Sequence, residues 1–266
     1  DWLTKLGYNA TTINPKQIVD GSLGFYRAFS TLGGPNQLGA YLILPLVFVL
    51  TYAIREKNPY LGILALPILG GIFLSFSRSA WIGSAVAAFI CITISLNKRY
   101  RTVFLVTSLV SASVVAIILF NLASTNQKFQ NILLHGRYYE NQLQGSDSQR
   151  LDSISSAINV IMMEPFGHGL GSAGPASYQS SAPVISENWY LQIAYEVGII
   201  GLILYIIGFT ALLGEFLRDR KNPLATALFS ATIGILLVNL FLHAWADSTL
   251  VLITFALYGL YRGKTA

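Results

Sequence analysis

Seven long apolar segments, separated by polar or charged turns, constrain this chain more than any other feature of its sequence. They cover residues 37–54, 59–75, 79–97, 102–123, 189–213, 223–242 and 247–261. A helix that crosses the hydrocarbon core of a bilayer needs roughly 20 mostly apolar residues. We therefore predict an all-α fold, a polytopic transmembrane helical bundle with these seven segments as its spans.

The composition agrees with this prediction and excludes other classes of protein. Of the 266 residues, 53% are hydrophobic and 11% are charged, whereas a soluble domain carries about twice that charged fraction. A soluble bundle of buried helices would need more charge to cover its surface. The one cysteine, Cys91, lies in an apolar run, which excludes an intrachain disulfide and a cysteine-based zinc site. The chain begins at Asp1 without a signal peptide, so we expect a piece of a longer protein or a processed one.

The basic residues in the turns predict the orientation of the bundle. With seven spans, ten of the seventeen Lys and Arg residues fall on one side, in four clusters. The clusters are Arg55 and Lys57; Lys98, Arg99 and Arg101; Arg218, Arg220 and Lys221; and Arg262 and Lys264. Because short cytoplasmic loops carry an excess of Lys and Arg, this side is predicted to be the cytoplasm. The net charge of +5 then reflects topology, and we expect no nucleic-acid partner.

This orientation divides the chain into four parts. Residues 1–36 form an extracytoplasmic segment, 37–123 four transmembrane helices, 124–188 an extracytoplasmic loop, and 189–266 three transmembrane helices with a cytoplasmic tail. A loop of this length is far longer than usual connections and is typically functional or disordered. Apolar residues at helical spacing over 148–163 predict an amphipathic helix on the membrane surface or across the bundle. Its apolar face comprises Leu151, Ile154, Ala157, Ile158 and Ile161.

Two arginines, Arg27 and Arg78, lie at the outer ends of spans, against the charge bias of the rest. An arginine in the hydrocarbon costs at least about 2.5–3.5 kcal/mol on insertion scales, which a partner, a cavity or a ligand usually offsets. Snorkelling to the headgroups or pairing with a loop carboxylate would explain either arginine alone. Both lie in patterned motifs, however, and a guanidinium binds phosphate oxygens bidentately. We therefore favour an outward-facing anionic headgroup as their ligand.

Further motifs follow one another along the chain. Arg27 precedes a Gly-Gly-Pro-Asn turn, in which Asn36 is expected to cap the first span. Arg78 lies in Ser-Arg-Ser-Ala-Trp at a hairpin tip. The long loop holds the helix that begins near Arg150 and a Gly-His-Gly-Leu-Gly turn. The fifth span opens with Glu-Asn-Trp-Tyr-Leu-Gln at 187–192, followed by Glu-Val-Gly.

This ordered set resembles the bacterial O-antigen ligase and polysaccharide polymerase family over residues 21 to about 250. In this family an arginine precedes a Pro-Asn helix start, and Ser-Arg-x-x-Trp lies at a hairpin tip. A long loop then holds a helix that begins with an arginine and a Gly-x-Gly-x-Gly turn. After the loop, a polar pair precedes Tyr-Leu-Gln. Its members usually carry additional N-terminal spans, which agrees with a fragment here. Many of its ligases have a histidine where this chain has Glu187, and glutamate there is similar to the polymerases.

The resemblance implies a multi-pass glycosyltransferase of the bacterial cytoplasmic membrane whose active site faces outward. It would move glycan from an undecaprenyl-pyrophosphate-linked donor to a hydroxyl of a glycan, lipid or protein, with no metal and no cofactor. Arg27 and Arg78 would stabilise the leaving pyrophosphate, and Glu187 would be the general base. The residues expected to bind substrate are Arg150, Asn188, Tyr190, Gln192, His168, His243 and Asp247.

Several assignments have an alternative. Glu187 would serve equally as a helix cap or in a loop ion pair. His243 and Asp247 have a spacing that suits a metal, but without a third ligand nearby we expect a hydrogen-bonded pair on one helix face at the outer rim. His168 would be a solvent-exposed turn residue, and Glu196 would be buried and hydrogen-bonded within the fifth span. A transporter, or a non-catalytic subunit that binds lipid-linked glycan, is the alternative function.

The predicted topology is tested by reporter fusions. Fusions after Lys57, Arg101 and Lys221 are expected to read cytoplasmic, and fusions within residues 130–180 are expected to read exterior. A cytoplasmic signal from the long loop would invert the topology and remove the outward-facing site with it.

Overall fold

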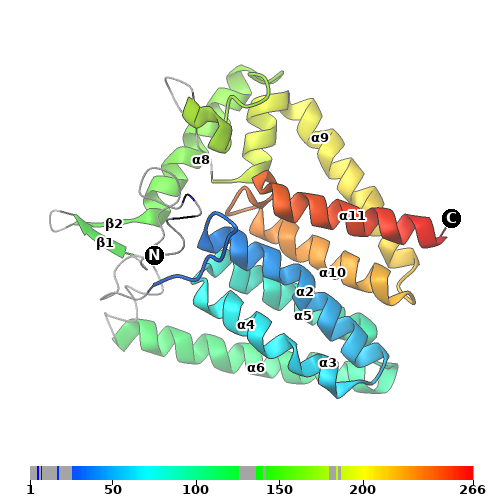
Figure 1. Ribbon diagram of the computed structural model, residues 1–266. Helices are drawn as coiled ribbons and strands as arrows, with labels where there is room; N and C mark the ends of the chain where they lie inside the picture. Colours follow the sequence, from blue (N-terminus) through cyan, green and yellow to red (C-terminus); the bar gives the residue numbers. More distant parts are fainter. Residues whose placement is uncertain are drawn as a thin grey trace.

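The computed structural model of the protein describes residues 5, 7, 17, 26–125, 136–139, 142–179, 184 and 187–265. In this part of the chain, long helices lie side by side in a bundle, and a smaller group of elements covers one end of it (Figure 1). The predictions for residues 1–4, 126–135 and 180–183 lie outside the described residues.

The elements are described in three groups: a first bundle segment, a loop and a second bundle segment. The first segment contains α2 (Pro35–Arg55), α3 (Pro59–Ile63), α4 (Ala65–Leu74), α5 (Arg78–Ser95) and α6 (Lys98–Thr125). The loop contains the antiparallel strands β1 (Gly136–Tyr139) and β2 (Gln142–Gly145), then α8 (Ser146–Met163) and the 3-10 helix η1 (Gly174–Gln179). The second segment contains α9 (Trp189–Arg218), α10 (Pro223–Val238), the 3-10 helix η2 (Ala244–Ala246) and α11 (Ser248–Thr265).

The helical character of the fold is confirmed, with one short β-hairpin in the loop. Within the described residues, four helices are long and apolar enough to cross a membrane, namely α2, α5, α6 and α9. The other three predicted spans fold as the shorter apolar helices α3–α4 and α10, and as α11. The number of seven spans therefore stays a prediction.

Two of the predicted spans differ from the helices that form. The second is divided at Leu64 into α3 and α4. Pro67 lacks the N–H that would bond to the carbonyl of Ile63, so one continuous helix loses a hydrogen bond here. The sixth ends at Val238 rather than at residue 242, because the N–H groups of Leu240 and Phe241 bond three residues back and tighten the chain into a turn.

Helix α10 forms the centre of the bundle. Eleven of its residues are buried, and it packs against α2, α5, α9 and α11. Where it crosses α5, Gly83 and Gly234 face each other, and a Cβ on either glycine would lie 2.7 Å from the carbonyl oxygen of the other. Such contacts between small residues allow membrane helices to approach closely.

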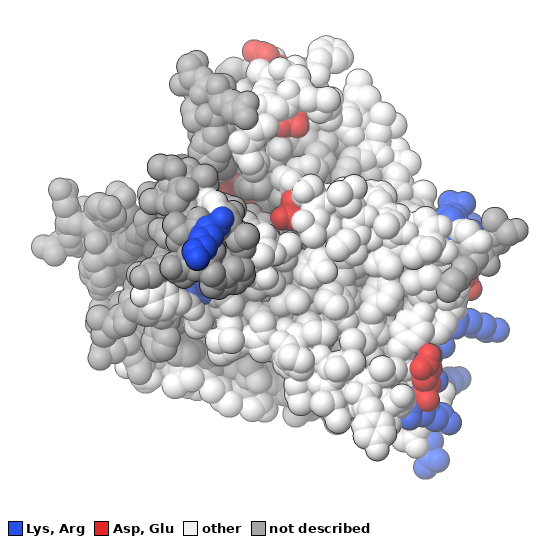
Figure 2. Space-filling view, in the orientation of Figure 1, with Lys and Arg blue, Asp and Glu red and all other residues white. Residues whose placement is uncertain are grey.

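The four basic clusters lie together at one end of the bundle, which we call the basic end. Arg55 Nη2 donates to Arg220 O at 2.9 Å, and Arg262 Nη2 donates to Glu215 Oε2 at 2.6 Å. Arg101 Nη2 donates to Leu96 O at 3.2 Å, at the turn between α5 and α6. Figure 2 shows Lys and Arg gathered along this edge of the molecule. The side of the membrane that this end faces stays a prediction.

The opposite end, which we call the loop end, is formed by the N-termini of α2, α5 and α9 and the C-terminus of α10. A Cβ on Gly39 of α2 would lie 2.5 Å from Ala80 Cβ of α5, so these two N-termini are adjacent. Trp189 N of α9 donates to Asn239 O, directly after α10, at 3.0 Å. The elements of the loop lie beyond this end in Figure 1.

Helix α9 is broken at Gly198, whose φ of 77° and ψ of 175° lie in a region that essentially only glycine adopts. The loop replaces the helical hydrogen bonds that the break removes. His168 N donates to Tyr195 O and Gly169 N donates to Glu196 O, each at 2.9 Å. Ile199 N donates to Pro165 O, also at 2.9 Å. Figure 1 shows the result, a short arm before the break and a long arm after it.

The predicted amphipathic helix is present as α8, and it packs against α9. Ala157 and Ile161 are buried, as predicted for its apolar face. Ile158, which was assigned to the same face, is 44% exposed to the surroundings of the chain.

The break in α9 generates a test of the fold. Gly198→Ala is expected to destabilise the protein, because strain in this region costs about 1–3 kcal/mol and the new Cβ would lie 2.6 Å from Pro165 O. Gly208→Ala, farther along the same helix, has no atom within 4 Å of its new Cβ and is the matched control. It is expected to be neutral or to stabilise by up to about 1 kcal/mol. Thermal unfolding in detergent measures both, and equal midpoints would contradict this account of the break.

Candidate functional site

Arg27 ties together two of the helix ends at the loop end. Its Nε donates to Ser75 O at 2.9 Å, and its Nη2 donates to Phe76 O at 3.3 Å, both in the turn between α4 and α5. The same Nη2 donates to Asn36 Oδ1 at 2.8 Å, in the first turn of α2. Asn36 was predicted to cap α2, but the N-cap is Gly34 and the Asn36 side chain accepts from Arg27 instead.

Arg78 is the first residue of α5 and is half-buried. The turn before it is held by Phe76 in a positive-φ conformation and by a hydroxyl pair, Ser77 Oγ and Ser79 Oγ, 3.2 Å apart. Trp81 Nε1 donates to Ile72 O at 2.9 Å, which closes the hairpin. The N-termini of α2 and α5 thus lie beside two arginines, and helix N-termini carry the partial positive charge that binds anions.

Asn188 fixes the start of α9 over the end of α10. Its Oδ1 accepts from Tyr190 N at 2.9 Å and from Leu191 N at 3.1 Å, so it is the N-cap. Its Nδ2 donates to Leu240 O at 3.0 Å. Glu187 directly precedes this cap and is exposed, so the prediction that Glu187 itself caps the helix is wrong. Sugar binding by Asn188 stays a prediction.

The other two polar residues at the start of α9 are bonded within the protein. Tyr190 Oη donates to Leu236 O of α10 at 2.8 Å. Gln192 is buried and donates to Glu196 Oε1 at 3.2 Å. Glu196 is half-buried and hydrogen-bonded, and it lies in the short arm of α9, before the break at Gly198. Substrate binding by Tyr190 and Gln192 stays a prediction.

His243 and Asp247 do not share a helix face, because they flank the 3-10 helix η2. Asp247 Oδ1 accepts from Leu250 N at 3.0 Å and so caps α11. Among the described hydrogen bonds none joins Asp247 to His243, and the predicted pair is wrong. His243 is half-buried, and burial lowers the pKa of its imidazole below the ordinary value of 6.5. The negative charge of Glu187 acts in the opposite direction on this pKa.

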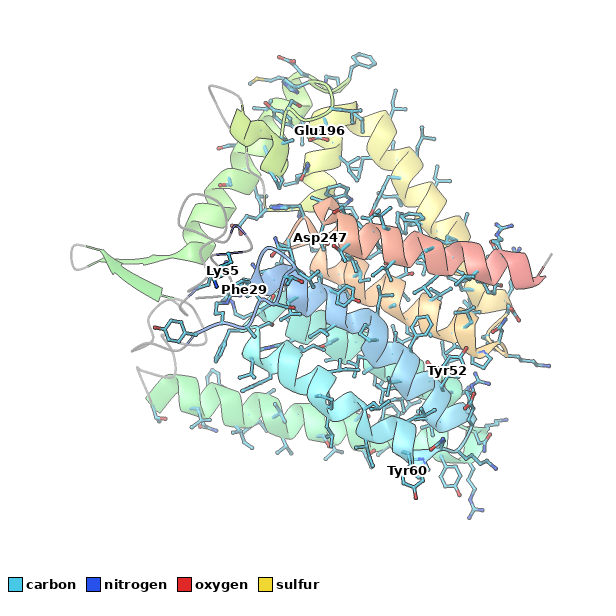
Figure 3. All side chains as sticks on the ribbon, viewed as in Figure 1. Lys5, Phe29, Tyr52, Tyr60, Glu196 and Asp247 are labelled. Atoms are coloured by element: carbon cyan, nitrogen blue, oxygen red, sulfur yellow. The ribbon has the colours of Figure 1, made fainter. Side chains whose placement is uncertain are left out.

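One hydrophobic cluster joins the two sides of the loop end. It contains Ala40 of α2 together with Leu242, Ala244 and Trp245 around η2, and Trp189 packs against it. Helix α2, whose first turn is bonded to Arg27, therefore packs against η2, which follows His243. Figure 3 shows labelled residues of both sides, Phe29 and Asp247, at this end, and Tyr52 and Tyr60 at the other. We call Arg27, Arg78, Glu187 and His243 the loop-end site.

Two further predicted residues lie in the loop. His168 was expected to be exposed, but its side chain is only 21% exposed. Its ring stacks on Tyr195 with centroids 4.2 Å apart, and its Nε2 lies 3.0 Å from Glu164 Oε2. Arg150 lies in α8, and its side chain is outside the described residues. Among the described residues, no group of three His, Cys, Asp or Glu side chains could hold a metal ion.

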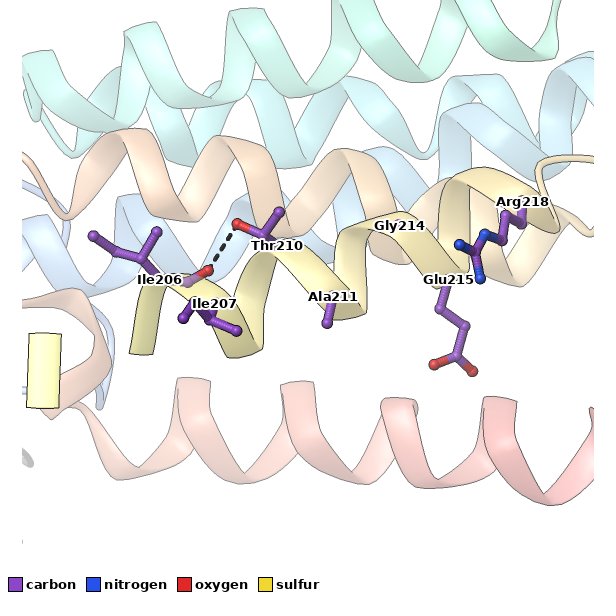
Figure 4. Close-up of a pocket in the computed structure, with 7 residues that line it drawn as sticks. All are labelled: Ile206, Ile207, Thr210, Ala211, Gly214, Glu215 and Arg218. Carbon is purple, nitrogen blue, oxygen red and sulfur yellow. Dashed lines mark hydrogen bonds between the residues drawn. The ribbon is translucent and has the colours of Figure 1, made fainter. Parts of the chain in front are cut away.

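A groove of about 660 Å³ runs along the long arm of α9, separate from the loop-end site. Figure 4 shows its lining, which is apolar near Ile206 and Ile207 and charged at Glu215 and Arg218. Because Glu215 pairs with Arg262, the charged part of the groove belongs to the basic end. The groove therefore does not connect Arg27 or Arg78 to Glu187.

Sequence reasoning missed the proximity of Glu187 to His243. The two residues are far apart in the chain, and only the bonds of Asn188 and Trp189 to the end of α10 bring them together. It also missed the acceptors of Arg27, for which Asn36 at the helix start was the available signal.

Comparison with known proteins agrees with this arrangement. Residues 62–206 match the family described as O-antigen ligase, which is more than half of the chain. The match runs from α3 to the long arm of α9 and includes Arg78, the glycine turn and Glu187. None of the curated proteins matches the chain. By this match and its apolar helices, the chain is an integral membrane protein that belongs to the O-antigen ligase family.

Proposed function

We propose that the protein is a glycosyltransferase that moves a glycan from an undecaprenyl-pyrophosphate carrier to an acceptor hydroxyl at the outer face of the cytoplasmic membrane. The observation that supports this proposal is that Arg27, Arg78 and the N-termini of α2 and α5 lie at the same end of the bundle as the segment after Glu187, which bonds to the end of α10. The basic end lies opposite, as an inner face requires.

The arginine side of the loop-end site suits the leaving group. When the bond between the anomeric carbon and the phosphate oxygen breaks, negative charge collects on the pyrophosphate. Fixed cationic donors and helix N-termini stabilise such charge without reorganising. Arg78 begins α5, and Arg27 bonds to the turn directly before it, so both guanidinium groups lie at the N-termini of α2 and α5.

The other side suits the acceptor. The acceptor hydroxyl attacks the anomeric carbon from the face opposite the leaving group and must lose its proton. Glu187 is an exposed carboxylate directly before the N-cap of α9, and we propose that it contributes to the activation of this hydroxyl. The loop lies over this end, because α8 packs against α9 and the loop backbone bonds to α9. We propose that the loop binds the saccharide.

Deletion of the gene in the source organism tests the proposal, with the surface glycan sized on a gel. Loss of long chains with single units retained indicates a polymerase, and long chains left on the carrier indicate a ligase. An unchanged glycan would contradict both activities. If the protein only binds the carrier and another protein catalyses the transfer, variants of the loop-end site would retain transfer.

Arg78 provides the residue-level test in the full-length protein. Arg78→Ala is expected to lower transfer by about 10²–10³-fold, the usual effect of removing one donor to a developing negative charge. Arg78→Lys should rescue poorly, because an ammonium cannot form the bidentate fork. Arg99→Ala, an exposed arginine at the basic end, is the matched control and should retain normal transfer. Membrane insertion is checked by the amount of protein extracted from the membrane, and near-normal activity of Arg78→Lys would contradict guanidinium recognition.

A further inference from the structure

The segment that begins at Glu187 is bonded to the segment that precedes His243. Next to Glu187, Asn188 Nδ2 donates to Leu240 O at 3.0 Å. In the following residue, Trp189 N donates to Asn239 O, also at 3.0 Å. The short stretch of chain that carries Glu187 is thus fixed to the short stretch that leads to His243.

The His243 side is equally constrained. Asn239 is fully buried, and its Oδ1 accepts from Trp245 N at 3.4 Å, which folds the turn after α10 back on itself. His243 O accepts from Ala246 N at 3.0 Å in η2. Its neighbours Leu242 and Ala244 are buried in the core cluster, which anchors the chain on both sides of His243.

We infer that His243 and Glu187 act as a dyad in which the imidazole of His243 takes the proton of the acceptor hydroxyl and the carboxylate of Glu187 stabilises the imidazolium. This inference rests on the proposed function and names the residue of the loop-end site that contacts the acceptor. His243 is then a catalytic residue, and Glu187 is a positioning residue that acts through it.

The step balances as follows in atoms and charge. The acceptor oxygen forms a bond to the anomeric carbon as the bond from that carbon to the phosphate oxygen breaks. The proton of the acceptor moves to the imidazole, and the electron pair of the broken bond leaves with the lipid pyrophosphate, beside Arg27 and Arg78. The imidazolium then releases its proton to water, and no oxidant, reductant or metal takes part.

The charges around His243 suit this role. Burial lowers the pKa of its imidazole below 6.5, so the ring is neutral and able to accept a proton at neutral pH. Glu187 partly opposes that effect. Of the other charged groups at this end, Asp247 beside η2 is bonded to the start of α11, and Arg27 and Arg78 lie on the α2 and α5 side.

The first test needs no substrate. Diethyl pyrocarbonate modifies neutral imidazole, and mass spectrometry of digests gives the modification rate of each histidine of the full-length protein against pH. The half-modification pH of His243 is expected below 6.5. This half-modification pH should fall further in Glu187→Gln and should be largely restored in Glu187→Asp. It should stay unchanged in the control Glu56→Gln, which removes an exposed carboxylate at the basic end. His168, whose partner is Glu164, is the internal reference. A His243 value that does not respond to Glu187→Gln would overturn the dyad.

The second test measures transfer, with carrier-linked glycan extracted from the deletion strain as donor. His243→Gln is expected to lower kcat by about 10²–10⁴-fold with little change in KM. Glu187→Gln should also lower kcat, and the double variant should lose no more than His243→Gln alone, because residues that act as a unit are not additive. The dyad would be overturned if the double variant lost kcat by the product of the two single losses. It would also be overturned if His243→Gln kept a normal kcat while Glu187→Gln lost activity, and Glu187 would then be the base. A glycan unchanged by gene deletion would instead overturn the proposed function, whatever the modification test gives.

Discussion

The hydrogen bonds between the loop backbone and the broken helix α9 are the interaction on which the rest of the structure depends. A break in a membrane helix leaves backbone groups without partners, at a cost of several kcal/mol for each group that stays unsatisfied in lipid. Pro165, His168 and Gly169 satisfy the groups freed at Gly198. Since a Cβ on Gly167 or Gly198 would lie 2.6 Å from a backbone atom of the other segment, the contact requires glycine on both sides.

This contact joins the fold to the site. It directs the short arm of α9 back over the end of α10, where Asn188 bonds to Leu240 O. It also fixes α8, which packs on α9, over the same end of the bundle. The glycine turn therefore has a structural role at the break, and the residues that we propose for the acceptor are positioned by it.

The arginine side is built differently, by polar side chains that replace backbone partners. The turn between α4 and α5 leaves the carbonyls of Ser75 and Phe76 outside helical pairing, and Arg27 donates to both. A residue predicted to bind phosphate thus also holds the hairpin tip that carries Arg78. Removal of Arg27 would affect both the tip and the charge of the site, which makes Arg78 the cleaner probe of phosphate recognition.

Much of this architecture could be predicted from the sequence, because apolar length, charge bias and helical spacing are local properties. The helices, the hairpin tip at Arg78 and the amphipathic helix α8 follow from such patterns. The burial of the His168 side chain, which depends on stacking with Tyr195, could not be predicted, since that contact joins distant segments. The same is true of Asp247, whose role was misassigned because the turn after α10 begins before residue 242. The bonds between the start of α9 and the end of α10, on which the proposed pairing of Glu187 with His243 rests, are a property of the fold and have no local signal.

A structure of the full-length protein bound to undecaprenyl pyrophosphate, determined by electron cryomicroscopy, tests the central claim most directly. The claim is that the loop end holds the leaving group on the side of α2 and α5 and the acceptor on the side of α9 and η2. We predict density for the two phosphates beside Arg78 at the N-terminus of α5, with His243 and Glu187 across the site from it. Phosphate density at the basic end, or in the groove along α9 near Arg218, would contradict the account.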